Sequence, residues 1–207
     1  MFPDRLRKGY RAFLDGRFVE EQERYRQLAD TGQSPSIMVI GCVDSRVSPE
    51  VIVDAAPGEL LVARNVANLV PRYEAGGGQH GASAALEFAV RALRIRHIVV
   101  LGHAFCGGIK AFADDSAPLT ESDFIGKWMS QIAPAADAIS VPKSDWDAYL
   151  HQLEFASVEL SLQNLMTFPF VKAAVEAGEL SLHGAYFGVA SGKLLVRNAA
   201  TGTFEPV

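Results

Sequence analysis

The chain has 207 residues, of which 49% are hydrophobic and 21% are charged, and its formal net charge is −5. This length and composition predict one globular domain with a substantial hydrophobic core. The negative charge argues against a nucleic-acid or anionic-membrane partner, because both favour clustered Lys and Arg. No apolar run has the length of a membrane span, and the N-terminus lacks the apolar core of a signal peptide, so we expect a cytoplasmic protein.

Predicted strands and helices alternate in the first half of the chain. Residues 4–30 carry apolar side chains among many charges and are predicted to be helical, with an interruption at Gly16, because glycine weakens a helix interior. Short apolar strands are expected at 36–41, 60–64 and 97–102, and a helix at 81–93. Apolar strands that alternate with helices are typical of a parallel sheet whose two faces are both covered.

The second half is predicted to be largely helical and to end in a pair of strands. Prolines interrupt the helical stretches, because proline breaks the interior hydrogen-bond ladder, and a Ser-Gly turn joins the strands. The expected ranges are helices at 121–139 and 145–178 and strands at 185–189 and 194–197. The predicted fold class is therefore α/β, with a mostly parallel central β-sheet flanked by helices in a single domain.

The domain over 1–207 is expected to consist of an N-terminal helical arm at 1–30 and an α/β core at 31–207. The arm is tied to the core only weakly by its sequence pattern. It could pack on a partner subunit, or it could be an amphipathic helix on its own core, and the pattern alone leaves both interpretations open.

Reactive side chains follow two of the predicted strands. Cys42 and Asp44 close the first strand, and His103 and Cys106 close the third; the chain has no other cysteine. Because the carboxyl ends of parallel strands meet at one edge of a sheet, these four groups are expected to lie together. Two thiolates, an imidazole and a carboxylate form a tetrahedral set that suits zinc. Taken singly, each residue has an ordinary structural explanation, but the combined spacing favours a zinc site.

Arg46 offers Asp44 an alternative partner through a bidentate ion pair. With Asp44 on the metal the site is closed, whereas with Asp44 on Arg46 the zinc can hold a water whose pKa falls to about 7. Cys106 and Gly107 open a predicted helix, and the free N–H groups there favour a thiolate and any developing anion.

Other histidines and glycines have no such neighbours. His80, His97, His151 and His183 stand without a second ligand type at chelating spacing, so we interpret them as structural. The run Gly76-Gly77-Gly78 is predicted to be a flexible loop, because it lacks the lysine and the preceding strand of a phosphate-binding loop.

The residues that carry these motifs make the sequence resemble the β-class carbonic anhydrases. The matching segments are GCVDSRVSPE (41–50), PGELLVARNVANLVP (57–71), GASAALEFAV (81–90) and HIVVLGHAFCGGIKA (97–111), with a weaker likeness over 164–180 and 182–194. The resemblance implies an α/β fold around a parallel sheet, one Zn²⁺ per subunit, and active sites near a subunit interface. It also implies a homodimer, or a tetramer or octamer built from dimers, with an N-terminal arm that embraces the partner.

The resemblance also implies roles for individual residues. It makes Cys42, His103 and Cys106 permanent zinc ligands, and it makes Asp44 the residue that either ligates zinc or pairs with Arg46. The catalytic residues it implies are Asp44 and Arg46. The substrate would contact Gln33 and the Gly107 N–H, and an apolar wall would come from Leu61, Val66 and Phe88. The last of these is a tyrosine in plant relatives, so a hydroxyl is missing here.

The family has two subtypes, and the resemblance to the plant-like one is stronger. The other subtype carries a tryptophan three residues before the first cysteine and a bicarbonate pocket that closes the site at low pH. Val39 and Phe187 stand where that pocket needs tryptophan and tyrosine, whereas Gln33 matches the plant-like subtype. We therefore expect an open site with Asp44 on Arg46 at neutral pH.

The resemblance implies the reversible hydration of carbon dioxide to bicarbonate and a proton, by attack of zinc-bound hydroxide. One alternative is a hydrolase of carbon disulfide or carbonyl sulfide with the same ligands, which pocket access rather than ligand identity would decide. Another is a non-catalytic zinc or thiol regulatory protein; the Asp44–Arg46 pair argues against it, because a structural site gains nothing from a displaceable ligand. The sequence identifies no proton shuttle.

Overall fold

The computed structural model describes residues 1–76, 80–114 and 124–207. Two of the predicted ranges extend beyond them: Gly77 and Gly78 of the glycine run, and the first residues of the helix expected at 121–139, lie outside the described residues. None of the described helices combines the length and the apolar character needed to cross a membrane.

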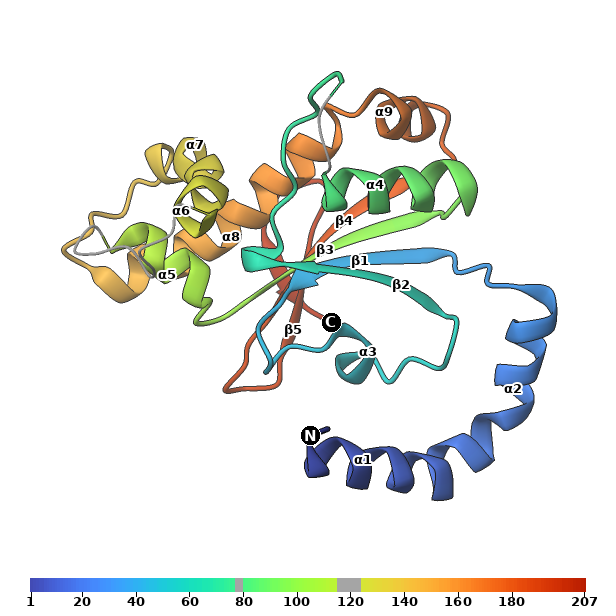
Figure 1. The fold of residues 1–207 in the computed structure, drawn as a ribbon. Coiled ribbons are helices and arrows are strands. Elements are labelled where there is room, and N and C mark those ends of the chain that lie inside the picture. Colours follow the sequence, from blue (N-terminus) through green and yellow to red (C-terminus); the bar gives the residue numbers. More distant parts are fainter. Residues whose placement is uncertain (77–79, 115–123) are drawn as a thin grey trace.

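A six-stranded sheet forms the centre of the fold (Figure 1). Its spatial order is β2-β1-β3-β4-β5-β6; the first four strands run parallel, and the last two are antiparallel to their neighbours. The strands are β1 (Ile37–Cys42), β2 (Leu60–Asn65), β3 (His97–His103), β4 (Ser181–Phe187), β5 (Leu194–Arg197) and β6 (Phe204–Pro206). The predicted α/β fold with a mostly parallel sheet is confirmed, while β6 at the sheet edge was not expected.

The register of β1 against its two neighbouring strands determines where the site lies. This strand lies between β2 and β3, with Cys42 opposite Asn65 on one side and Gly41 opposite Leu101 on the other. All three strands therefore finish at the same edge of the sheet, and the turns that follow them emerge side by side.

Helices cover one face of the sheet. Met38 and Ile40 of β1 and Ile98 of β3 point toward this face and are at most 5% exposed. They pack under three elements: α4 (Gly81–Glu87), which continues as a π-helix over Phe88–Ala92, α8 (Trp146–Leu165) and α9 (Pro169–Glu176) (Figure 1). This burial of alternate strand residues accounts for the apolar runs in the sequence.

A second hydrophobic cluster lies beyond the carboxyl ends of β1 and β3 and includes both cysteines. Helices α5 (Gly107–Ala113), α6 (Phe124–Met129) and α7 (Ala133–Asp137) gather there with the first half of α8 (Figure 1). Pro134 and Pro169 stand at the first turns of α7 and α9, where the missing N–H costs nothing, so the prolines divide the helical region as expected.

The opposite face of the sheet is largely uncovered by helices in the described part of the chain, although Val39, Leu101 and Ala185 at its centre are buried (Figure 1). Val39, Val99, Leu101 and Leu194 line an apolar hollow of about 470 Å³ on this face, and among the described helices the four-residue α3 (Pro49–Ile52) reaches it. The sequence pattern predicted two covered faces. The residues on this side are apolar, as a covered face requires, but the described residues of this chain supply only part of the cover.

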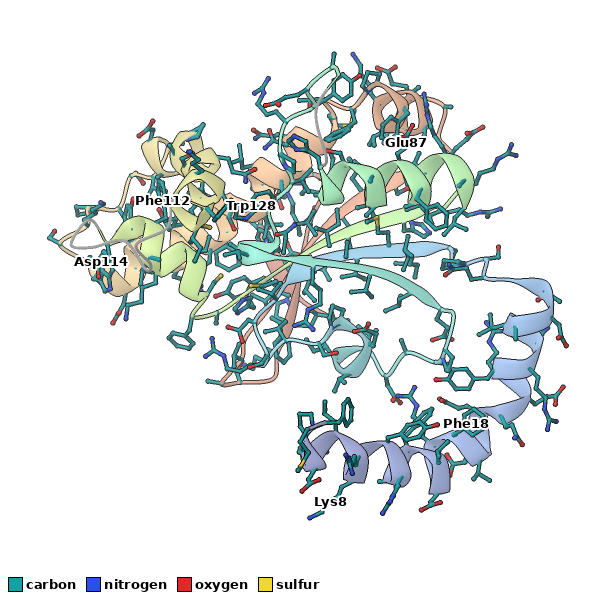
Figure 2. The ribbon with its side chains drawn as sticks, in the orientation of Figure 1. Lys8, Phe18, Glu87, Phe112, Asp114 and Trp128 are labelled. Atoms are coloured by element: carbon teal, nitrogen blue, oxygen red, sulfur yellow. The ribbon has the colours of Figure 1, made fainter. Side chains whose placement is uncertain are left out.

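The N-terminal arm leaves the sheet ahead of β1 and curves round on the side of α3 (Figure 1). It consists of α1 (Asp4–Asp15) and α2 (Arg17–Thr31), separated at Gly16 as predicted, and neither helix contains a buried residue. Arg17 and Arg24 donate hydrogen bonds to the carbonyls of Ala55 and Pro57 ahead of β2, at 2.8 and 3.1 Å. An amphipathic helix packed on its own core would bury one face, and this arm does not (Figure 2).

Candidate metal centre

Three buried side chains converge where β1 and β3 end. Cys42 is the last residue of β1, His103 is the last residue of β3, and Cys106 follows one turn later as the N-cap of α5. Their ligand atoms all lie within 4.8 Å of one another, and the two sulfurs are 4.0 Å apart. Two sulfurs on a tetrahedral zinc ion with Zn–S bonds of about 2.3 Å would be separated by roughly 3.8 Å. The spacing therefore suits one zinc ion.

His103 presents a free nitrogen to this cluster. Its Nδ1 hydrogen-bonds to the carbonyl of Ala104 at 3.0 Å, so Nδ1 carries the proton and Nε2 keeps its lone pair. Among the described residues, nothing hydrogen-bonds to the buried Nε2. Since buried polar atoms are nearly always paired, this orphaned nitrogen fits a metal ligand, and the backbone carbonyl fixes the tautomer that a metal requires.

The two thiols already favour a thiolate. The hydrogen bond from the Cys106 thiol lowers the pKa of Cys42 to about 4, and that same contact raises the pKa of Cys106. The Ala67 N–H also points at the Cys42 sulfur, at 3.4 Å. Thiolate sulfur is a soft ligand, so with an imidazole it selects zinc over magnesium or calcium. The donor set therefore fits the ion predicted from the sequence.

Asp44 lies beside the cluster and is bound to Arg46. Arg46 donates from Nε and Nη2 to the two carboxylate oxygens at 2.9 and 2.6 Å, and its backbone N–H adds a third bond at 2.9 Å. These bonds hold the pKa of Asp44 well below its usual range. One carboxylate oxygen is 4.0 Å from His103 Nε2. A rotation of the Asp44 side chain would bring it to a metal held by the cluster, but here Arg46 holds it away.

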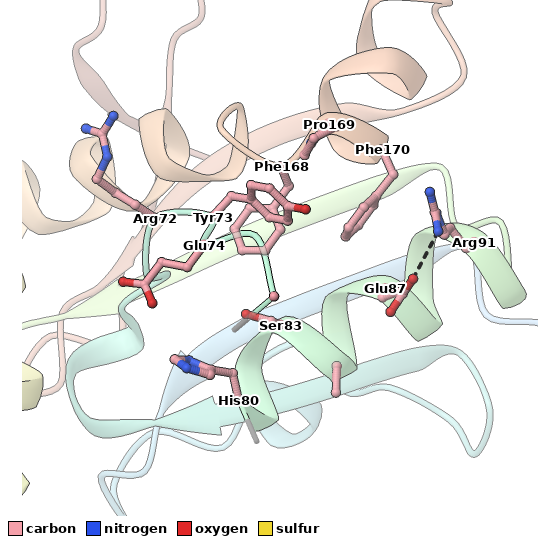
Figure 3. Close-up of a pocket in the computed structure, with 12 residues that line it drawn as sticks. Arg72, Tyr73, Glu74, His80, Ser83, Glu87, Arg91, Phe168, Pro169 and Phe170 are labelled. Carbon is pink, nitrogen blue, oxygen red and sulfur yellow. Dashed lines mark hydrogen bonds and ion pairs between the residues drawn. The ribbon is translucent and has the colours of Figure 1, made fainter. Parts of the chain in front are cut away.

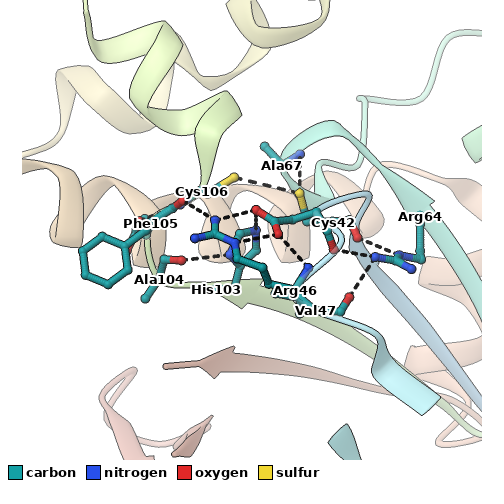
Figure 4. A network of polar contacts seen from close by, with 11 residues as sticks. Cys42, Arg46, Val47, Arg64, Ala67, His103, Ala104, Phe105 and Cys106 are labelled. Carbon is teal, nitrogen blue, oxygen red and sulfur yellow. Dashed lines mark hydrogen bonds and ion pairs between the residues drawn. The ribbon is translucent and has the colours of Figure 1, made fainter. Parts of the chain in front are cut away.

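Arg64 is a residue of this site that the sequence reasoning missed. Its guanidinium, reaching across from β2, donates to the carbonyls of Cys42 and Asp44 at 2.7 Å each and of Val47 at 2.9 Å (Figure 4). One side chain thus fixes the turn that carries a cysteine ligand and the movable carboxylate. The available signal was a charged residue within the apolar strand sequence LLVARN.

Two of the expected substrate residues lie near the cluster. Val66 directly follows β2, beside the Ala67 N–H that reaches Cys42, and it lines a cavity of about 700 Å³ together with Val43 and Trp128. Gly107 is the first residue of α5, next to Cys106. Their roles in substrate binding stay predictions.

The other three expected substrate residues do not reach the cluster of their own chain. Leu61 pairs with Met38, four residues before Cys42, which places it about 13 Å back along the sheet. Gln33 precedes β1 altogether, and Phe88 is half exposed and does not line the cavity beside Val66. Their assignment to the substrate pocket stays a prediction, which the cluster of one chain alone does not meet.

A separate cavity of about 420 Å³ lies between the loop at 72–76 and helices α4 and α9 (Figure 3). His80 borders it, and Arg91 pairs with Glu87 at 3.1 Å along one wall. It contains none of the residues of the cluster. His97 and His183, also predicted to be structural, hydrogen-bond to each other at 3.2 Å on the uncovered face of the sheet.

The sequence is similar to those of known enzymes. The sequence model of a family described as carbonic anhydrase matches residues 37–194. Beta carbonic anhydrase 5, chloroplastic, of Arabidopsis thaliana is 36% identical over 89% of this chain and 61% of its own length, so the chain spans less than two thirds of that relative. Beta carbonic anhydrase 3 of the same plant is 34% identical over 91% of this chain and 74% of its own length.

Solved structures with a similar fold carry related names. The beta-carbonic anhydrase CcaA superimposes with a TM-score of 0.89 at 29% identity, over 98% of both chains. A tetrameric beta-carbonic anhydrase of the filamentous ascomycete Sordaria macrospora gives a TM-score of 0.78 at 26% identity, over 95% of both chains. The similarity therefore extends over the sheet and over the turns that hold the cluster.

Replacing a residue of the cluster should release the metal. We expect the wild-type protein to retain zinc after dialysis against a weak chelator, and Cys106→Ser and His103→Ala to lose most of it, because each variant lacks one of the buried ligand atoms. Metal content by mass spectrometry measures this. His151→Ala is the matched control, since His151 is exposed and contacts the rings of Phe155 and Tyr186 instead. A Cys106→Ser protein that keeps its zinc would contradict the site.

Removing the Arg64 guanidinium should loosen the turn after β1. We expect Arg64→Ala to lower the free energy of unfolding by about 1–3 kcal/mol, because three carbonyls lose a charged donor. Arg64→Lys should recover only part of this, since one ammonium cannot span the three acceptors. Urea unfolding measures the loss. Arg91→Ala removes an exposed ion pair and should cost less than about 1 kcal/mol; an Arg64→Ala protein equally little affected would refute the role of Arg64.

Proposed function

The chain belongs to the β class of the carbonic anhydrase family, and we propose that it is a zinc-dependent enzyme that interconverts carbon dioxide and bicarbonate. The observation that carries this proposal is the cluster of Cys42, His103 and Cys106 with its unpaired, buried Nε2, beside a carboxylate that Arg46 holds off the metal position. A purely structural zinc site would have no use for a fourth ligand kept at a distance.

Zinc, when bound, supplies a Lewis acid that lowers the pKa of a coordinated water. The residues of this chain would orient the water and bind the substrate. Asp44 is ionised and fixed in direction by Arg46, so it can accept a hydrogen bond from the attacking water and orient it. The apolar side chain of Val66 would suit an uncharged gas and help to exclude bulk water, and the Gly107 N–H would contact a substrate oxygen.

The active site would be completed by a second copy of the chain. Gln33, Leu61 and Phe88 lie away from the cluster of their own chain, whereas the resemblance assigns all three to the substrate pocket. The apolar face of the sheet lacks a full cover, and the arm has no buried residue, so the two have complementary needs for burial. A homodimer in which each arm lies against the partner would meet both, and the tetrameric relative supports further pairing of such dimers.

We assign the protein to the open, plant-like subtype. Val39 and Phe187 belong to the apolar cluster on the uncovered face and offer no polar group for a bicarbonate pocket. Asp44 is bound to Arg46 rather than turned into the cluster. A crystal structure at pH 7 with Asp44 bonded to zinc would overturn this assignment. A cytoplasmic location stays a prediction, and one of the curated relatives is chloroplastic.

Carbon dioxide hydration should be measurable at both pH 7 and pH 8.5. We expect zinc-loaded wild-type protein to be active at both values in a stopped-flow assay, because an open site does not depend on alkaline release of Asp44. Asp44→Asn and Arg46→Ala should keep their zinc but lose on the order of 10²-fold in kcat, since the attacking water is no longer oriented. Glu176→Ala, an exposed change on α9, is the control.

The same assay separates the alternatives. Zinc-loaded protein that hydrates no carbon dioxide at either pH would refute the proposed activity. Turnover of carbon disulfide or carbonyl sulfide instead would identify the hydrolase on the same ligands. Absence of all three activities would leave the zinc or thiol regulatory protein.

Deleting the N-terminal arm should separate the subunits. We expect a protein lacking residues 1–30 to shift from dimer or tetramer to monomer in light scattering and to bind a hydrophobic dye, because its apolar sheet face is exposed. Its hydration rate should fall by at least tenfold although every zinc ligand remains. A protein lacking only residues 1–3, which precede α1, is the control. A fully active, unchanged oligomer after the longer deletion would contradict the arm's role.

A further inference from the structure

Glu154 is a buried carboxylate that the proposed reaction does not use. It lies on α8 and is 6% exposed, and it forms no ion pair with another described residue. A buried carboxylate without a cation costs free energy unless hydrogen bonds compensate for the lost water. We therefore expect the buried Glu154 carboxylate to have a specific role.

One donor to this carboxylate comes from the turn that carries a metal ligand, and the other comes from β4. The Cys106 N–H donates to one oxygen at 3.2 Å, and the Tyr186 hydroxyl donates to the other at 2.5 Å. Burial raises the pKa of Glu154, while the bonds from Tyr186 and from the N–H groups of Cys106 and Phe105 oppose that rise. The carboxylate thus joins the Cys106 N–H, in the turn that follows His103, to the Tyr186 hydroxyl on β4.

That turn contains a strained residue. Phe105 has a φ of +59°, in the left-handed region that side chains with a Cβ rarely adopt. Its own side chain is 69% exposed, so packing does not hold it there. Such a conformation persists only where the surroundings enforce it.

Hydrogen bonds enforce the conformation from two sides. Arg46 donates to the Phe105 carbonyl at 3.0 Å on the exposed side, and Glu154 accepts from the Cys106 N–H on the buried side (Figure 4 shows the Arg46 contact). Only two residues separate His103 from Cys106. The left-handed step at Phe105 reverses the chain within that distance, so that the Cys106 sulfur returns to within 4.8 Å of the other ligand atoms.

We propose that Glu154 is a positioning residue for the zinc site: it holds the Phe105–Cys106 turn in its left-handed conformation and so keeps the Cys106 thiolate in place to bind zinc. The inference rests on the proposed zinc function but concerns metal binding rather than turnover. Residues that orient metal ligands typically change metal affinity by about 10- to 100-fold when they are removed.

A double-variant cycle with glycine tests this inference. Glu154→Leu removes both acceptor oxygens, so zinc affinity measured by competition with a chromophoric chelator should fall by about 10- to 100-fold. Phe105→Gly alone should bind zinc at least as tightly as wild type, because glycine adopts a positive φ freely. The double variant should regain at least fivefold over Glu154→Leu, since zinc no longer has to enforce a strained turn.

Further variants and a second readout separate positioning from folding. Glu154→Gln keeps one acceptor oxygen and should lose less than Glu154→Leu; if the leucine variant does not fold, the cycle is run with glutamine. Asn164→Leu on the same helix removes a buried hydrogen bond to the Val70 carbonyl, at 2.8 Å, and should leave zinc affinity unchanged. With cobalt in place of zinc, the thiolate charge-transfer band should weaken in Glu154→Leu and return in the double variant.

Two results would overturn the proposal. The first is a zinc affinity and cobalt spectrum equal to wild type in both Glu154 variants. The second is a loss that Phe105→Gly does not restore, which would make Glu154 a structural residue only. Failure of the proposed activity looks different, because the wild-type protein would then bind zinc normally and hydrate no carbon dioxide.

Discussion

The parallel register of β1 against β3 is the constraint on which the rest of the structure depends. It aligns Gly41 with Leu101, so that the turns after the two strands leave the sheet at the same edge. A slip of one residue would turn Met38 and Ile40 out of the core and move Cys42 away from His103 at once. The burial that stabilises the sheet therefore also fixes the distance between the ligands, without further cost to the site.

Charge balance accounts for the arrangement of the charged residues around the cluster. With zinc bound, the metal and Arg46 carry three positive charges, and Cys42, Cys106 and Asp44 carry three negative ones. A neutral assembly suits a buried position and an uncharged substrate. The neighbouring groups are arranged to preserve it: among the described residues, Arg64 hydrogen-bonds to backbone carbonyls, and Glu154 accepts from a neutral N–H and a hydroxyl. Neither adds an ion pair that would compete with the Asp44–Arg46 pair.

The sequence predicted the features that depend on local pattern or spacing. The strands follow from apolar runs, and the approach of Cys42 to Cys106 follows from strand ends in a parallel sheet. The contacts of Arg64 could not be predicted, because a guanidinium that binds backbone carbonyls requires no particular residue type at the positions it binds. The left-handed conformation of Phe105 was missed for a similar reason. A glycine at this position would have indicated a positive φ, but a phenylalanine held by contacts of Arg46 and Glu154 does not.

The same alternation within β1 connects folding, association and chemistry. Met38 and Ile40 face the helices of their own chain, while Ile37 and Val39 face the uncovered side. One face is filled internally and the other only in part: Val39 is 6% exposed and Ile37 is half-buried, so a second chain lying on this side would complete the cover. The residues assigned to the substrate pocket that lie far from the local cluster, Gln33 and Leu61, flank or pair with this same strand. Association would thus bury the sheet and supply the missing part of the pocket in one step, which ties the activity of this fold to its oligomeric state.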